Sequence, residues 1–220
     1  MKNSSKAKNE NTEFYVQLGI MAILALVIVF NVGRIYSEIY SENGIATGVG
    51  IVSASEIIPK GMPAVYGVEI GVRYDDISAG NPGLADATIR KLSQYEDMDL
   101  NQEQMARYIG IGSSISCEYC CGAKAIIFSN GERACGCAHS YAMRGVAKYL
   151  LINHPEMSNE EILSELGKWK VLFFPGIHEQ KADILKANGV DFTNYINLAS
   201  NLYRGIEQGQ TSDGQMVGGC

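Results

Sequence analysis

The sequence predicts a helix-rich α+β fold, with one N-terminal transmembrane helix followed by a single Cys-rich globular domain. Three observations predict it: an uncharged apolar run near the N-terminus, short β-branched segments after it, and helical patterns with capping residues in the second half. We expect residues 1–13 to be a cytoplasmic tail, 14–33 the transmembrane helix, 34–49 a tether, 50–206 the globular domain and 207–220 a flexible tail.

The composition is that of a folded globular protein. The 220 residues are 46% hydrophobic and 19% charged, which argues against extensive disorder. The formal net charge is −6, and no basic stretch supplies the positive face that general nucleic-acid binding requires. We therefore expect no nucleic-acid partner.

The first predicted element is the membrane span. Residues Phe14 to Gly33 carry no charged side chain, and at about 1.5 Å per residue a helix of this length crosses a bilayer core. No small-x-small cleavage site follows the run, which favours an uncleaved signal anchor. Lysines precede it and only Arg34 follows closely, so we expect the N-terminus in the cytoplasm and the domain outside. The expected partners are the lipid bilayer and a membrane or extracytoplasmic protein, which the sequence does not identify.

The globular part begins with segments that predict strands. Residues 50–76 hold short β-branched runs broken by glycines and prolines, which indicate two or three short strands. Alternation over Val65–Val72 supports one of them. Helical spacing follows over Leu84–Met98, and Asn101 with Gln104 forms a capping pair for a helix that runs through Ile109.

The second half predicts helices and one turn. Ala125–Phe128 suggests a short strand before a tight turn at Ser129-Asn130-Gly131. One helix is expected over Ala138–Asn153, and a second runs from a capping box at Ser158 and Glu161 toward Trp169. Pro175 closes that region. A last helix is expected over His178–Asn188 and is ended by Gly189. His154 is expected at a helix end and His178 on the surface.

The chemistry lies in a cluster of cysteines. Five of the six fall in two strings, Cys117-Glu-Tyr-Cys120-Cys121-Gly and Cys135-Gly-Cys137-Ala-His139. Two residues between the first two cysteines let both sulfurs face one ion, and alternation in the second string puts its donors on one side. The candidate ligands are Cys117, Cys120, Cys135 and Cys137, with Cys121 and His139 as alternates. Zinc in a structural role is expected, and copper or an iron–sulfur cluster stays open.

Two alternatives to a metal site remain open. Cys117 and Cys120 could form the redox pair of a thiol–disulfide oxidoreductase, with Cys117 attacking and Cys120 resolving. The cysteines could instead be structural disulfides of an interaction domain, which an extracytoplasmic location permits. Only the first of these alternatives makes the protein an enzyme.

Two resemblances accompany the cysteine strings. The run Cys-Glu-Tyr-Cys-Cys-Gly with Ala-Cys-Gly-Cys-Ala-His-Ser resembles uncharacterised membrane-anchored archaeal proteins from about Ile58 to Ile206, which implies a recurring domain without a known activity. The segment from Cys135 to Pro175 is similar to the thiol-reducing helical domain of cytochrome c maturation proteins. That resemblance implies an outward-facing redox domain, but the family has Cys-x-x-Cys where this chain has Cys135-Gly-Cys137.

Overall fold

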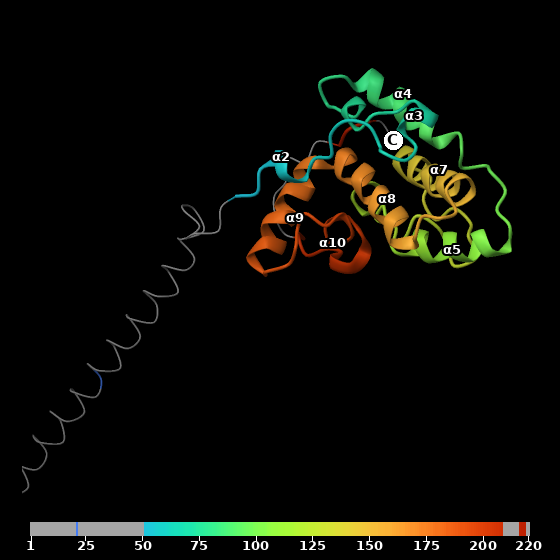
Figure 1. The fold of residues 1–220 in the computed structure, drawn as a ribbon. Helices are drawn as coiled ribbons and strands as arrows, with labels where there is room; N and C mark the ends of the chain where they lie inside the picture. The colour runs from blue at the N-terminus through green and yellow to red at the C-terminus, as the bar shows by residue number, and fades with distance from the viewer. Residues whose placement is uncertain (1–20, 22–50, 209–215, 219–220) are drawn as a thin grey trace, which may run out of the picture. The chain divides into compact units, whose positions relative to one another are not determined.

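The computed structural model describes residues 21, 51–208 and 216–218. Ile51–Cys220 form one compact unit. Its helices, shown in Figure 1, are α2 (Ala54–Ile57), α3 (Gly67–Ile70), η2 (Tyr74–Asp76), α4 (Pro82–Ser93), α5 (Gln102–Ser113), α6 (Glu118–Cys121), α7 (Ala138–Asn153), α8 (Asn159–Phe173), α9 (Pro175–Ala187), α10 (Tyr195–Ala199) and η3 (Asn201–Tyr203).

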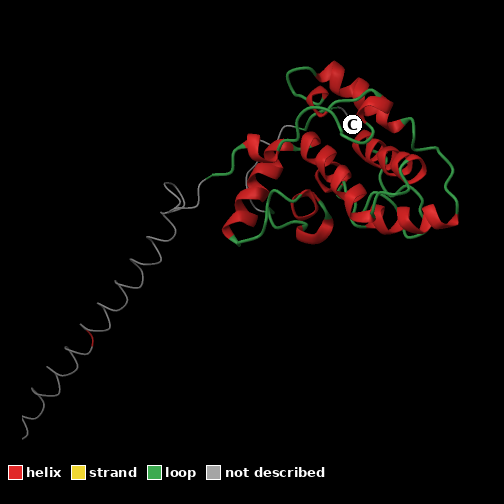
Figure 2. Cartoon of the chain, viewed as in Figure 1, coloured by secondary structure: helices red, strands yellow, loops and turns green. Residues whose placement is uncertain are grey.

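The predicted β component is wrong for the described residues. They contain no strand (Figure 2), and their β-pairing is limited to one antiparallel bridge between Ile127 and Arg133. Where Val65–Val72 alternates, the chain forms α3 instead, with the N–H of Ile70 bonded to the carbonyl of Tyr66. A lone strand there would have no neighbour to complete its hydrogen bonds, whereas a helical turn satisfies its own.

The predicted helices of the second half are confirmed. Both capping boxes form, Asn101 with Gln104 and Ser158 with Glu161, because each N-cap side chain accepts from the N3 backbone N–H. The span of α7 matches the prediction. Pro175 differs from expectation: it opens α9 at its first position, where a missing N–H costs nothing.

The core is built around α7 and α8. Helix α7 packs against α4, α5 and α8, and α8 also contacts α10. The two helices bury Met143, Leu150, Trp169 and Phe173 completely. The first turn of α7 is buried as well, since His139 and Ser140 are fully buried; Figure 1 shows α7 and α8 among the other helices. The cysteine strings flank that turn.

The predicted membrane span lies outside the described residues, apart from Met21, which is helical. Within the part of the chain that the structure describes, no helix has both the length and the apolar character needed to cross a bilayer. The predicted boundaries of the tail, span, tether and domain stay predictions.

Candidate metal centre

Three segments bring the cysteines together. Cys117 is the N-cap residue of α6, and Cys120 and Cys121 lie within that short helix. Gly122 ends α6 with φ of 68°, a left-handed conformation that glycine adopts without strain. Cys137 is the N-cap residue of α7. The cluster therefore joins two helix N-termini to the loop between the helices.

A tight turn carries the second cysteine string back to the first. The N–H of Phe128 donates to the carbonyl of Glu132 at 2.7 Å, and the N–H of Ala134 donates to the carbonyl of Ile126 at 3.2 Å. Gly131 has φ of 85°, as the predicted Asn-Gly turn requires. The predicted turn is thus confirmed, and the predicted strand is reduced to the single bridge.

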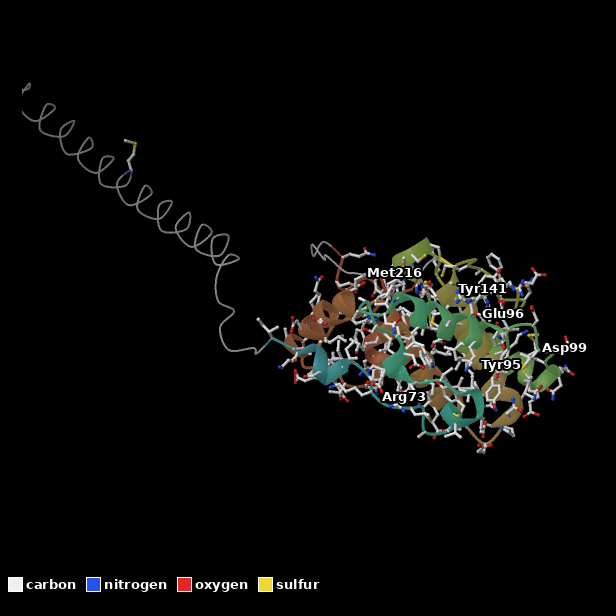
Figure 3. The ribbon with its side chains drawn as sticks, turned by 90° about the horizontal axis from the view of Figure 1, so that it is seen from above. Arg73, Tyr95, Glu96, Asp99, Tyr141 and Met216 are labelled. Atoms are coloured by element: carbon white, nitrogen blue, oxygen red, sulfur yellow. A yellow bond between two sulfur atoms is a disulfide. The ribbon has the colours of Figure 1, made fainter. Side chains whose placement is uncertain are left out.

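A buried arginine fixes this turn from inside. The Arg144 guanidinium, fully buried on α7, donates through Nη1 to the carbonyls of Ile126 and Cys135, each at 2.9 Å. Its Nε donates to Glu96, and its guanidinium lies 4.6 Å from the centroid of the Tyr141 ring. Figure 3 labels Glu96 and Tyr141, the two side chains that flank it. The charge is therefore paired, and both arms of the turn are held to one side chain.

The sulfur atoms form a compact group. The Sγ atoms of Cys117 and Cys137 are 3.2 Å apart, and those of Cys137 and Cys135 are 3.5 Å apart. In a tetrahedral zinc site with Zn–S bonds of about 2.3 Å, neighbouring sulfurs are about 3.8 Å apart. Shifts of a few tenths of an ångström convert these contacts to that spacing.

Two sets of potential ligands emerge from this geometry. In each, one donor atom per residue lies within 4.8 Å of all the others. The first set, which we call group A, is Cys117, Cys120, Cys137 and His139; the second, group B, is Cys121, Cys135 and Cys137. All six predicted candidates are therefore brought together. Within group A, His139 takes the place that the sequence interpretation gave to Cys135.

The imidazole of His139 is oriented as metal-binding histidines are. It is fully buried on the first turn of α7, and its Nε2 lies 2.9 Å from the carbonyl of Val217. A carbonyl only accepts, so Nε2 carries a proton and donates it to Val217. Bonding of the second ring nitrogen to a backbone carbonyl fixes the tautomer of a ligand in this way.

The cysteines are partly oxidised in the structure. Cys121 and Cys135 form a disulfide, and Cys120 is also disulfide-bonded. Cys117 and Cys137 are buried free thiols. Structural disulfides account for Cys120, Cys121 and Cys135, but they do not account for the close pair of free thiols, Cys117 and Cys137. Cys220 lies outside the described residues.

The two free thiols differ in acidity. The hydrogen bond between their sulfurs lowers the pKa of Cys137 and raises that of Cys117, because ionisation of one thiol in such a pair disfavours ionisation of the other. The side chains of His139 and Ser140 and the backbone N–H of Ser140 lower the pKa of Cys137 further. A thiolate at the N-terminus of a long helix is also favoured by the helix dipole. Cys137 therefore has the lower pKa of the pair and, rather than Cys117, is the thiol that ionises first.

A buried ionic network adjoins α6. The Lys170 ammonium is fully buried and donates to Glu118 at 3.0 Å and to the carbonyl of Ala199 at 2.8 Å. Arg204 also pairs with Glu118, at 3.0 Å. Burial lowers the pKa of Lys170 to about 8, against the opposing effect of Glu118. Nothing in the sequence pattern indicated this network, because its members are far apart along the chain.

The remaining histidines lie outside the cluster. His154 caps the end of α7, as predicted. The expectation that His178 lies on the surface is wrong: its side chain is fully buried between Tyr119 and Phe174. Pro175 starts α9 one turn earlier than predicted and so turns His178 inward.

Comparisons with protein-family models, with curated proteins and with solved structures found no match to this chain. The two resemblances of the cysteine strings thus stay predictions.

Proposed function

We propose that this protein binds a thiophilic divalent metal ion, zinc foremost, through the four residues of group A: Cys117, Cys120, Cys137 and His139. In this role the ion would tie α6 to the start of α7 and stabilise the domain. Cys120 must be reduced before it can bind, so the binding form is the reduced protein.

One observation carries the proposal: three cysteine sulfurs and one nitrogen of the His139 ring all lie within 4.8 Å of one another. Three of the four residues are buried. Three thiolates and one imidazole are a common set for structural zinc, whose four sites are all filled by protein. The hydrogen bond from His139 to Val217 supports the assignment, because it orients the ring before any metal binds.

Zinc is favoured over copper by the donor set. A closed set of four thiolate and imidazole ligands suits the tetrahedral preference of zinc, whereas Cu(I) favours sites richer in sulfur alone. Copper handling and an iron–sulfur cluster remain alternatives for the same residues. Metal selectivity is therefore part of the test.

The test is titration of the reduced full-length chain with Co²⁺, followed by displacement with Zn²⁺. We expect thiolate-to-cobalt charge-transfer bands and the visible bands of tetrahedral cobalt. His139→Gln keeps a nitrogen near the position of Nε2 and removes Nδ1. We expect it to weaken binding by at least the roughly 10- to 100-fold that loss of a ligand's hydrogen-bonded neighbour costs.

His154→Gln is the matched control, since His154 pairs with Glu69 far from the cysteines. It should bind cobalt as the unmodified chain does. Absence of charge-transfer bands in the reduced chain, or equal affinities for both histidine variants, contradicts the proposal.

A second function, thiol–disulfide exchange, is favoured by one contact. The Cys137 sulfur lies 3.5 Å from that of Cys135, which is bonded to Cys121. Attack by the Cys137 thiolate would form a Cys135–Cys137 disulfide and release the Cys121 thiolate, so no external oxidant is required. In this alternative Cys137, rather than Cys117, is the attacking residue.

Turnover separates the two functions. A thiol–disulfide oxidoreductase would catalyse reduction of a disulfide substrate by a dithiol, and Cys137→Ser would abolish the catalysis. If the chain shows no turnover above the dithiol alone and binds metal, the exchange reaction is excluded.

We also propose that residues 14–33 hold this domain at a membrane, with the domain outside the cytoplasm. The support is the absence of charge over these residues and the lysines before them. Resistance of the protein to extraction from membranes at alkaline pH, with protease access from outside, is the expected result. Release by alkali would contradict it.

A further inference from the structure

Cys137 belongs to both ligand groups. Group A holds Cys117, Cys120 and His139 around it, and group B holds Cys121 and Cys135 around it. Its sulfur has a cysteine on each side, Cys117 at 3.2 Å and Cys135 at 3.5 Å. A thiolate has lone pairs for two metal ions, and a thiolate between two sets of donors is the arrangement of a bridged pair of ions.

Resting on the proposed function, we infer that the fully reduced protein binds two divalent ions, with Cys137 bridging them. One ion would take group A. The other would take Cys121 and Cys135 beside the shared thiolate, and solvent would complete its coordination. The ligand class is a thiophilic d¹⁰ divalent ion, such as Zn²⁺ or, as a probe, Cd²⁺.

The charges fit two divalent ions. Five thiolates and two divalent ions leave one net negative charge, whereas two monovalent ions would leave three. The surroundings offset a small negative charge: Lys170 interacts electrostatically with Cys117, and the N-terminus of α7 points at Cys137. Divalent ions are thus the better match to this buried site.

The Cys121–Cys135 disulfide makes the second ion conditional on reduction. With the disulfide closed, group B retains only the shared Cys137. A dithiol reductant transfers two electrons and two protons to the disulfide, which yields two cysteine thiols and a cyclic disulfide of the reductant. The thiol protons then leave as the ion binds. Reduction therefore sets how many ions the protein holds.

The local structure tolerates both states of group B. Cys121 lies on the exposed side of α6, while Cys135 is buried and its carbonyl is held by Arg144. This hydrogen bond is made by the backbone of Cys135 and does not involve its sulfur, so reduction of the disulfide removes none of its atoms. The exposed Cys121 is the side from which a dithiol can reach the bond.

The test is titration of the full-length chain with ¹¹³Cd²⁺ under anaerobic conditions, with stoichiometry by elemental analysis and ¹¹³Cd NMR. For the fully reduced chain we expect two ions and two resonances, each split by coupling through the bridging sulfur. Three variants report on the groups: Cys121→Ser with Cys135→Ser, His139→Gln, and Cys137→Ser.

The variants give distinct results. The Cys121→Ser/Cys135→Ser chain should hold one ion and show one unsplit resonance, which matches the effect of the closed disulfide. His139→Gln should shift one resonance and keep the other. Cys137→Ser should lose tight binding of both ions. Serine is a preferred N-cap residue, so this variant keeps the start of α7, and circular dichroism checks its fold.

Failure of this inference is distinguishable from failure of the proposed function. Binding of a single ion by the reduced chain would overturn the bridged pair of ions and leave the group A site standing. Two resonances without coupling, one of which persists in Cys137→Ser, would do the same. Two ions in the chain with Cys121–Cys135 closed overturn the redox condition. No ion in any form contradicts both.

Discussion

At the scale of single residues, Cys137 combines a structural role with a chemical one. Its sulfur accepts from the N–H of Ser140 as the N-cap of α7 and lies within contact distance of two other cysteine sulfurs. Serine, threonine, aspartate and asparagine are the residues preferred at this position. A cysteine there places a thiolate where the exposed N–H groups of the helix stabilise negative charge.

The capping role predicts a difference between two substitutions in the metal-free chain. Cys137→Ala removes the acceptor for the Ser140 N–H and should lower the free energy of unfolding by about 0.5–2 kcal/mol. Cys137→Ser should cost less, because its hydroxyl can cap. Urea denaturation of the reduced, chelated proteins measures both. Equal losses would show that the cap contributes nothing.

His178 predicts a loss of stability in acid. Burial, then the charges of Lys170 and Lys181, lower its pKa well below the ordinary value, while its Nδ1–H bonds the carbonyl of Phe174. Below about pH 6.5 the unfolded chain takes up a proton that the folded chain does not, so the free energy of unfolding falls by about 1.4 kcal/mol per pH unit from this group.

The variant His178→Asn tests this. Asparagine keeps a donor near the position of Nδ1 and removes the titration. Between pH 6.5 and 5 the unmodified chain should lose about 2 kcal/mol more than the variant, measured by denaturation of the metal-free proteins. Parallel pH profiles would mean that folding does not change the pKa of His178, and would contradict this account of its burial.

At the scale of elements, the crossing of α4 and α7 depends on one glycine. A Cβ on Gly145 would lie 2.1 Å from the carbonyl oxygen of Leu92, a backbone atom that cannot move without separating the helices. This crossing also positions the turn that follows α4, where Glu96 meets Arg144. The close approach of the helices therefore supports the arginine that holds the cysteine turn.

Gly145→Ala should accordingly destabilise the domain, by about 1–3 kcal/mol or more, as over-packed sites do. Gly110→Ala on α5 is the matched control, since nothing lies within 4 Å of the added Cβ. There alanine should stabilise the helix by up to about 1 kcal/mol. Thermal denaturation of the two variants measures the contrast, and a neutral Gly145→Ala would argue against this helix crossing.

Removal of the Arg144 side chain should also be severe. Arg144→Met leaves the carbonyls of Ile126 and Cys135 and part of the Glu96 charge unpaired in the interior, at a cost of about 3–5 kcal/mol. Adding Glu96→Gln should recover part of the loss, because it removes the buried charge. Chemical denaturation of the single and double variants checks this. If the double variant is no more stable than Arg144→Met, Arg144 stabilises the domain through packing and not through its pairing with Glu96.

The secondary-structure elements that the sequence predicted correctly are those with local signals. Capping boxes at Ser158 and Asn101 and the Asn130-Gly131 turn are local signals, and all three form. The strands expected over residues 50–76 failed because pairing of strands depends on neighbours that a local pattern does not contain. Short alternating runs are compatible with a single helical turn, and α3 is one.

The candidate site was predictable in its members but not in its pairing. The two cysteine strings, with His139 at the end of the second, contain every residue of groups A and B. Which sulfur faces which depends on the turn at Gly131 and on the buried Arg144, contacts that spacing does not reveal. Group A contains His139 where the sequence interpretation had Cys135, because the helical start of α7 turns His139 inward.

At the scale of the whole molecule, the described residues form a helical domain that contains one cluster of cysteines. The cluster lies between α6 and α7, and its donors are buried except for Cys120 and Cys121, which are the more accessible ones. The state of these cysteines would therefore respond to the redox conditions outside the core, while Cys117, Cys137 and His139 stay protected. The proposed anchor would determine which compartment sets those conditions.

The most direct test of the central claim is the metal content of the full-length chain purified under anaerobic conditions, with free thiols counted before and after chelation. We expect bound zinc in stoichiometric amount, thiols that become reactive only after the metal is removed, and loss of metal in Cys117→Ser. A metal-free protein whose reduced thiols react at once, and which takes up no added zinc, would contradict it.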